Sequence, residues 1–265
     1  MALKGSHEEH IVVNETLLSG IQSVSFSQNV QEQVVSYLGN DFGGTTINGP
    51  TVVTSAIDKI LLNQDFITGL TGLTNISGQF EYGDNLANFS QGVLNAYAVS
   101  ASIGQIPQIS FDLSIYGSIS GAETSIKSTA SNDNTFETVN QEKLIITYDK
   151  GITNPIQSFN FSETFNAQPI YGVGQSTPSH ISIVGPIICE ASISIEVEDY
   201  EFEETFSFLS GSKNRSRDIK LQISGNSGIL NTFEVNNASL ISEDITAGVG
   251  DTIIANFSYR GYKKV

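Results

Sequence analysis

The side chains that most often carry out chemistry in proteins are scarce in this chain. It contains three histidines (His7, His10 and His180) and one cysteine, Cys189. A Ser-His-Asp site needs a histidine that neighbouring groups hold in place, whereas His180 lies alone in a Ser/Pro-rich loop. Cys189 lies within an apolar alternation, which is typical of a buried structural thiol. The sequence therefore predicts no catalytic residues and a protein that is not an enzyme.

Two short segments superficially resemble metal sites. In His7-Glu8-Glu9-His10 the histidines are three positions apart, whereas the helical zinc motif needs them four apart. Asp133 lies in the oxygen-rich stretch Ser131-Asn132-Asp133-Asn134, which lacks the glycine and the closing glutamate of an EF-hand loop. No spacing among the acidic residues singles out a pair for glycoside hydrolysis. We predict neither a bound metal nor a cofactor.

Charge is a stronger signal than any of these motifs. The chain has 12 basic and 28 acidic residues and a formal net charge of −16. Both halves are acidic, with 3 basic and 13 acidic residues up to Asn140 and 9 and 15 after it. Binding nucleic acid through phosphates needs Lys and Arg. The composition therefore argues against gripping nucleic acid, and it suits a surface that must not adhere to a polyanion.

Two charged clusters lie in the second half. The acidic run comprises Glu196, Glu198, Asp199, Glu201, Glu203 and Glu204. It is either a solvated strand face or hairpin tip, or a functional acidic surface. The basic cluster comprises Lys213, Arg215, Arg217 and Lys220. An anion site is one interpretation of it, and a contact with an acidic patch on a neighbouring subunit is the one we favour.

The elements that must position these side chains are strands. Apolar residues at every second position from Ile187 to Val197 alternate with Glu and Ser, which predicts a strand with one dry face and one acidic face. Similar alternation surrounds Phe26 and Phe161, which we expect to be buried at equivalent positions. Only Asn63–Thr71 suggests a short helix. The sequence predicts an all-β protein with no membrane-spanning helix.

Blocks of the first half recur in the second. Ile21–Ser27 matches Ile156–Ser162 at an offset of 135 positions, and Leu94–Val99 matches Leu230–Val235 at 136. Ile47-Asn48-Gly49-Pro50 likewise matches Ile183-Val184-Gly185-Pro186. The period is far longer than that of solenoid repeats. We predict a flexible arm over 1–19, a first β-domain over 20–140 and a second over 141–265, with the boundary in the polar stretch that begins at Ser118.

These blocks also carry a resemblance. Gly20–Phe26, and Asn95–Ser100 with Gly104-Gln105-Ile106-Pro107 and the Phe111 strand, resemble virion structural proteins of tailed bacteriophages. The chain is similar to the tail tube family, whose fold is shared with the type VI secretion tube and with baseplate hub proteins. The resemblance covers most of the first half and much of the second. The second copy departs from it at Val249–Thr252, where the proline of the first copy is missing.

The resemblance implies two tandem tail-tube-like β-sandwich or barrel domains, each with at most one short helix. In this family six domains surround a channel, so a duplicated chain implies trimeric, pseudo-hexameric rings that stack into a tube. Joining strand edges into a ring removes open sheet edges. DNA would pass as non-adhering cargo along an acidic lumen lined by Asp112, Glu196 and Glu198. The basic cluster, Lys213 to Lys220, would contact the next ring.

The same resemblance implies a location in the virion after synthesis in the bacterial host cytoplasm, without membrane binding. The tail sheath and other tail and baseplate proteins are further candidate partners. Two alternatives stay open. One is a baseplate hub, tube-initiator or distal-tail ring protein of the same fold. The other is a β-sandwich module that binds a receptor or carbohydrate, which predicts exposed aromatic clusters at loop tips.

Overall fold

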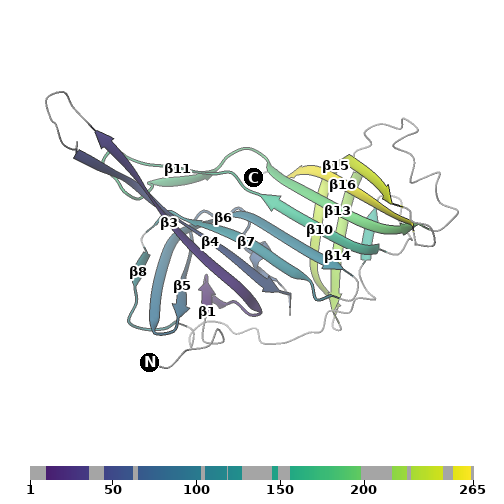
Figure 1. The fold of residues 1–265 in the computed structure, drawn as a ribbon, viewed down its shortest axis with the longest axis horizontal. Coiled ribbons are helices and arrows are strands. Elements are labelled where there is room, and N and C mark those ends of the chain that lie inside the picture. The colour runs from purple at the N-terminus through teal and green to yellow at the C-terminus, as the bar shows by residue number, and fades with distance from the viewer. Residues whose placement is uncertain are drawn as a thin grey trace.

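The structure is a computed structural model. It describes residues 10–35, 45–61, 65–102, 105–117, 119–126, 145–148, 156–197, 217–225, 228–246 and 253–263. Within these ranges it contains sixteen β-strands and one short 3-10 helix, η2 (Phe66–Leu70). The predicted all-β fold is confirmed (Figure 1), and the helix expected over Asn63–Thr71 is this five-residue 3-10 helix.

The strands of the N-terminal half are β1 (His10–Val13), β2 (Thr16–Leu17), β3 (Ile21–Val35), β4 (Thr45–Ile60), β5 (Ile76–Tyr82), β6 (Asn85–Ser102), β7 (Gln108–Ile115) and β8 (Ile119–Gly121). They pair antiparallel in the order β2-β1-β5-β6-β7-β4-β3, and β8 adds to β6. The long strand β6 pairs with β5 through its first part and with β7 through its second part. It therefore connects the β2-β1-β5 strands to the β7-β4-β3 strands.

The strands of the C-terminal half are β9 (Ile145–Tyr148), β10 (Ile156–Thr164), β11 (Ala167–Ile170), β12 (His180–Ile183), β13 (Ile187–Val197), β14 (Arg217–Gly225), β15 (Gly228–Thr246) and β16 (Ile253–Lys263). They pair in the order β10-β13-β16-β15-β14-β9, while β11 and β12 form a separate two-stranded sheet. This order matches that of β3-β4-β7-β6-β5-β1, strand for strand.

The registers of the strands repeat as well. Phe26 lies opposite Ser55 in the β3–β4 ladder, and Phe161 lies opposite Ala191 in the β10–β13 ladder. Phe161 follows Phe26 by 135 positions and Ala191 follows Ser55 by 136. The N-terminal block of the sequence repeat is thus also a repeat of strand pairing.

The predicted equivalence of the later sequence block is wrong. We expected Leu94–Val99 to correspond to Leu230–Val235. In the structure, Leu94 pairs with Leu113 just before a register shift in β6. Leu240 pairs with Tyr259 just before the same shift in β15. The offset here is 146 because the β14–β15 hairpin and the segment between β13 and β14 are longer than their counterparts. The hairpin is extended along its strands, since its connection has two residues like that of β5–β6, and the register of β15 with β16 beyond it is preserved.

The two halves meet where β6 pairs with β10, in the middle of Figure 1. Val99 lies opposite Phe161 in this ladder, and a single 14-stranded sheet results. One apolar core continues through both halves, with the Tyr97 and Phe233 rings 6.3 Å apart. The expectation of two separate β-domains is therefore not confirmed, although the strands of each half stay together.

The expected arm over residues 1–19 is wrong for its last ten positions. β1 pairs with β5, and Ile11, Val12 and Val13 are buried. Its counterpart β9 pairs with β14 in the same register: Ile11 lies opposite Phe80, and Ile146 lies opposite Leu221. An apolar run such as Ile11–Val13 is stabilised by burial against a sheet rather than left in water.

Candidate functional site: the polar face of the sheet

The large sheet has one dry face and one polar face where β4, β7, β6, β10, β13 and β16 lie side by side. Along β10, Phe159 and Phe161 are buried, whereas Asn160 between them is exposed. Successive side chains of a strand point to opposite faces, and residues directly opposite on neighbouring strands share a face. The register therefore assigns every side chain of this region to one face.

One row of the polar face crosses both halves without a break. The residues of this row are Ser23, Asp58, Ser110, Ala98, Ser162, Glu190, Arg260 and Ser239. The adjacent core row, from Lys59 through Val99 and Phe161 to Tyr259, is buried. Short polar side chains on one side and apolar ones on the other explain why this sheet buries only one face.

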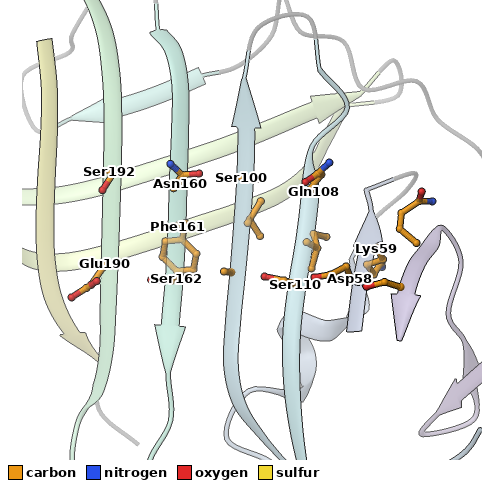
Figure 2. A pocket seen from close by; sticks show the side chains of 15 residues that line it. Asp58, Lys59, Ser100, Gln108, Ser110, Asn160, Phe161, Ser162, Glu190 and Ser192 are labelled. Carbon is orange, nitrogen blue, oxygen red and sulfur yellow. Dashed lines mark hydrogen bonds between the residues drawn. The ribbon is translucent and has the colours of Figure 1, made fainter. Parts of the chain in front are cut away.

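A shallow recess of about 530 Å³ lies over this face around the joint between the halves. Figure 2 shows its labelled side chains in a band across neighbouring strands, from Asp58 and Ser110 to Ser162 and Glu190. Ten of the fifteen lining residues carry hydroxyl, amide or carboxylate groups, and Val99, Ile109 and Phe161 supply apolar surface between them. Because the lining is spread across neighbouring strands of one sheet, we describe the recess as a surface feature rather than a pocket that encloses a small molecule.

The polar face carries a negative charge. In the described part of the chain its carboxylates are Asp58, Asp112, Glu190, Glu196 and Asp244, and its one guanidinium is Arg260. An Nη atom of Arg260 lies 2.6 Å from Glu190. Partial burial, and then the charge of Asp58, raise the pKa of Asp112. The carboxylates of Asp58 and Asp112 are thus close enough to repel each other.

Two of the three residues predicted to line an acidic lumen belong to this face. Asp112 lies on β7, two residues from Ser110, and Glu196 lies on β13, two residues from Ser194. The Gln157 side-chain amide donates a hydrogen bond of 2.8 Å to Glu196. Glu198 lies outside the described residues. The structure places both described acids on one face, and the lumen itself stays a prediction.

The basic cluster is described only in part. Lys213 and Arg215 lie outside the described residues, and Arg217 begins β14. Lys220 forms an ion pair with Glu234 of the neighbouring strand, at 3.2 Å between Nζ and Oε1. Both side chains are about half exposed, and ion pairs of this kind contribute little to stability. The inter-ring contact stays a prediction.

The two phenylalanines expected at equivalent core positions are not equally buried. Phe161 is 3% exposed, as expected, and its ring centroid lies 5.0 Å from that of Phe233. Phe26 is 49% exposed and touches only the edge of the core, with its ring 4.3 Å from that of Phe80. The prediction for Phe26 is wrong because β6 covers β10 on the side opposite β13, whereas β3 pairs only with β4 in the described part of the chain.

Sequence reasoning missed a buried ion pair beneath the polar face. Lys59 and Asp65 are 4% and 2% exposed, with Nζ and Oδ1 2.9 Å apart. The Tyr97 hydroxyl donates a hydrogen bond of 2.8 Å to the second oxygen of Asp65. Burial, and then the charge of Asp65, raise the pKa of Tyr97 well above its ordinary value. In β4, Lys59 is an even number of positions from the buried Val53 and Ile57, so the alternation of the strand already indicated that its side chain points into the core.

This ion pair also connects the two halves. The backbone N–H of Asp65 donates to the side-chain oxygen of Asn231, at 3.3 Å. Asn231 lies on β15 of the second half and is buried. A buried charge is tolerated when it is paired and hydrogen-bonded. The arrangement is a structural support for the joint rather than a site open to substrate.

The remaining candidate groups have ordinary roles. Cys189 is 2% exposed, with its Sγ 3.7 Å from Glu163 Oε1. Burial, reinforced by the charge of Glu163, raises the pKa of this thiol to about 12. The thiolate is the reactive form, so Cys189 is the structural thiol that the sequence predicted. His180 is exposed at the start of β12. His7 and Asp133 lie outside the described residues.

Comparison with known proteins adds no relative. No protein-family model matches the sequence, and no curated protein matches it. In the described ranges, three or more His, Cys, Asp or Glu side chains never gather closely enough to hold a metal ion. The same ranges contain no helix of the length and apolar character needed to cross a membrane. The polar face is therefore the feature on which a functional interpretation depends.

Proposed function

We propose that this chain is a structural protein of a bacteriophage tail. Its subunits assemble into rings, the rings stack into a tube, and the polar face of the sheet lines the channel through which DNA passes. Three chains, each contributing two repeats, surround the channel. The acidic wall keeps the DNA from adhering as it moves.

The observation that carries this proposal is the continuity of the polar face across both repeats. The face passes through the β6–β10 joint without a break and carries five carboxylates against one guanidinium in the described part of the chain. A protein gains affinity for DNA with each phosphate that Lys or Arg neutralises. A broad face that is polar and negative gains none of this affinity, which suits a wall along which DNA must slide.

The repeated ladders support the same proposal. A closed ring of similar units needs each unit to join the next through the same pair of edges. The two halves of the chain have the same strand order, and they are joined edge to edge by β10 and β6. One chain therefore already contains one such contact between two similar units.

Electron microscopy of the purified chain tests the proposal. We expect rings with a central channel and stacks of these rings, and native mass measurement should give three chains of 28.5 kDa per ring. Rings that never stack would favour a baseplate hub, tube-initiator or distal-tail ring protein of the same fold. A chain that stays monomeric over the whole accessible concentration range would refute the assembly role.

Charge reversal tests the role of the face. The double substitution Asp112→Lys with Asp244→Lys should make assembled rings retain DNA from the expression host, seen as increased absorbance at 260 nm relative to 280 nm. Asp84→Lys with Glu123→Lys is the matched control, because it makes the same change of charge at two exposed carboxylates that follow β5 and β8, outside the polar face. Equal DNA retention by both variants would show that the polar face does not line the channel.

A further inference from the structure

The joint between β6 and β10 provides a template for a contact that a single chain cannot make. Strand β10 begins the strand order β10-β13-β16-β15-β14-β9 of the second half, and it pairs with the second part of β6, from Ala96 to Ser102. When the ladders of the two halves are matched, β3 is equivalent to β10. The second part of β15, from residue 242 onward, is equivalent to the second part of β6. Both counterparts exist in the chain, but they are at opposite ends of the run β3-β4-β7-β6-β10-β13-β16-β15.

Each counterpart has an open edge. Within the described residues, β3 pairs only with β4, and Ser242–Thr246 of β15 pair only with β16. An open edge presents a row of N–H and C=O groups that can pair with another strand. The two edges are those that β10 and β6 use to join each other inside the chain.

Side-chain burial changes in the same sense at both edges. Phe161 is 3% exposed at the joint, whereas its counterpart Phe26 is 49% exposed. Phe165 is 4% exposed, whereas its counterpart Val30 is 46% exposed. On the other side, Val99 is buried, whereas its counterpart Ile245 is only partly buried. Apolar side chains that the joint covers in the middle of the chain are left open at its ends.

We infer that β3 of one chain pairs antiparallel with the second part of β15 of a second copy, in the register of the β10–β6 ladder. By equivalence with the observed Phe161–Val99 pair, Phe26 lies opposite Ile245 of the second copy. By equivalence with the observed Asn160–Ser100 pair, Ser25 lies opposite Thr246 of the second copy. The contact continues the sheet and its polar face from chain to chain. This inference rests on the proposed self-assembly and specifies its contact.

The chemistry of the two edges is compatible with this register. The segment Ser23–Asn29 carries no charged side chain, so none opposes the carboxylate of Asp244, which would face Ser27. Phe26 and Ile245 would form an aromatic and β-branched cross-strand pair of the kind that stabilises sheets. Because the two edges differ, the contact is heterologous and repeats from chain to chain until it closes a ring or extends a filament.

Disulfide trapping tests the register in the full-length chain, with Cys189→Ala as the background. Ser25→Cys and Thr246→Cys are placed on separate chains, which are mixed before assembly and then oxidised. Opposite residues of an antiparallel pair have Cα atoms close enough for a disulfide. We expect a covalent dimer in the mixture and none from either variant alone. The matched control is Asn160→Cys with Ser100→Cys in one chain, which should close the equivalent bond within the chain.

The outcomes separate the inference from the proposed function. Replacing Thr246→Cys by Ser242→Cys moves the thiol about 13 Å along the strand, and this mixture should give no dimer. Rings that form without a Ser25–Thr246 cross-link, while the internal control closes, would overturn the inferred contact and leave the proposed function standing. Dimers from Ser25→Cys alone would also overturn it, because like edges would then be paired. A wild-type chain that never assembles would overturn both.

Discussion

Replacing Phe161 with alanine removes a ring from the middle of the joint between the two halves. The side chain is 3% exposed, lies opposite Val99 in one ladder and Ala191 in the other, and contacts the ring of Phe233. Removing a buried phenylalanine costs about 3–5 kcal/mol, because the free energy cost of the remaining cavity adds to the lost transfer free energy. We expect Phe161→Ala to lower the free energy of unfolding by this amount.

Phe26→Ala is the matched substitution at the equivalent position of the first repeat. Because 49% of this side chain is exposed, it loses roughly half of the 1.5–3 kcal/mol that full burial supplies, about 1 kcal/mol. Its edge contact with Phe80 adds about 0.5–1.5 kcal/mol. In the monomeric chain, Phe26→Ala should therefore cost about 1.5–2.5 kcal/mol, less than Phe161→Ala.

Urea unfolding of the monomeric chain measures both values, with an unchanged slope as the sign that the unfolding transition is the same. Equal losses for the two variants would contradict the assignment, because they would mean that β6 does not cover Phe161 as the structure shows. A larger loss at concentrations where rings form is expected for Phe26→Ala, since the second copy then covers this ring.

Three further predictions concern single groups. Asp65→Asn should lower the free energy of unfolding by about 3–5 kcal/mol because it leaves Lys59 charged and buried without its carboxylate. The double substitution Lys59→Met with Asp65→Leu should recover most of this loss in the same urea assay. An equal loss for the two variants would contradict the ion pair. The Cys189 thiol should resist a thiol reagent at mildly alkaline pH until the chain is unfolded, because burial raises its pKa to about 12; rapid labelling of the native protein would refute this. The pKa of Asp112 is raised in the folded chain above its ordinary value of 3.8. Ionisation of Asp112 therefore lowers the stability of the folded chain as the pH rises above 3.8. Asp112→Asn should therefore be more stable than wild type at neutral pH, with a gain that vanishes in acid, and a gain that is independent of pH would contradict the shared charge.

Much of the local structure could be predicted from the sequence. The alternation from Ile187 to Val197 predicts a strand with one buried and one polar face, and the structure has both. The match between Ile21–Ser27 and Ile156–Ser162 predicts a repeat that the strand registers reproduce. These predictions succeed because side-chain period and strand register are local properties of the chain.

The candidate site was only partly predictable. Asp112 and Glu196 could be assigned to polar strand faces, but that they share one face depends on the pairing of β6 with β10. Alternation could also have marked Lys59 as an inward residue. Its partner Asp65 lies outside the strand, where no pattern assigns a direction to the side chain.

The sequence by itself determined that the chain is all-β, acidic and internally repeated, because composition and alternation act within each strand. Only the tertiary structure decided that the repeats share one sheet, that the later repeat is offset by 146 rather than 136 positions, and that Phe26 is exposed where Phe161 is buried. The physical reason is that burial depends on which strand lies alongside. β10 has β6 beside it within the chain, whereas β3 pairs only with β4 in the part of the chain that the structure describes.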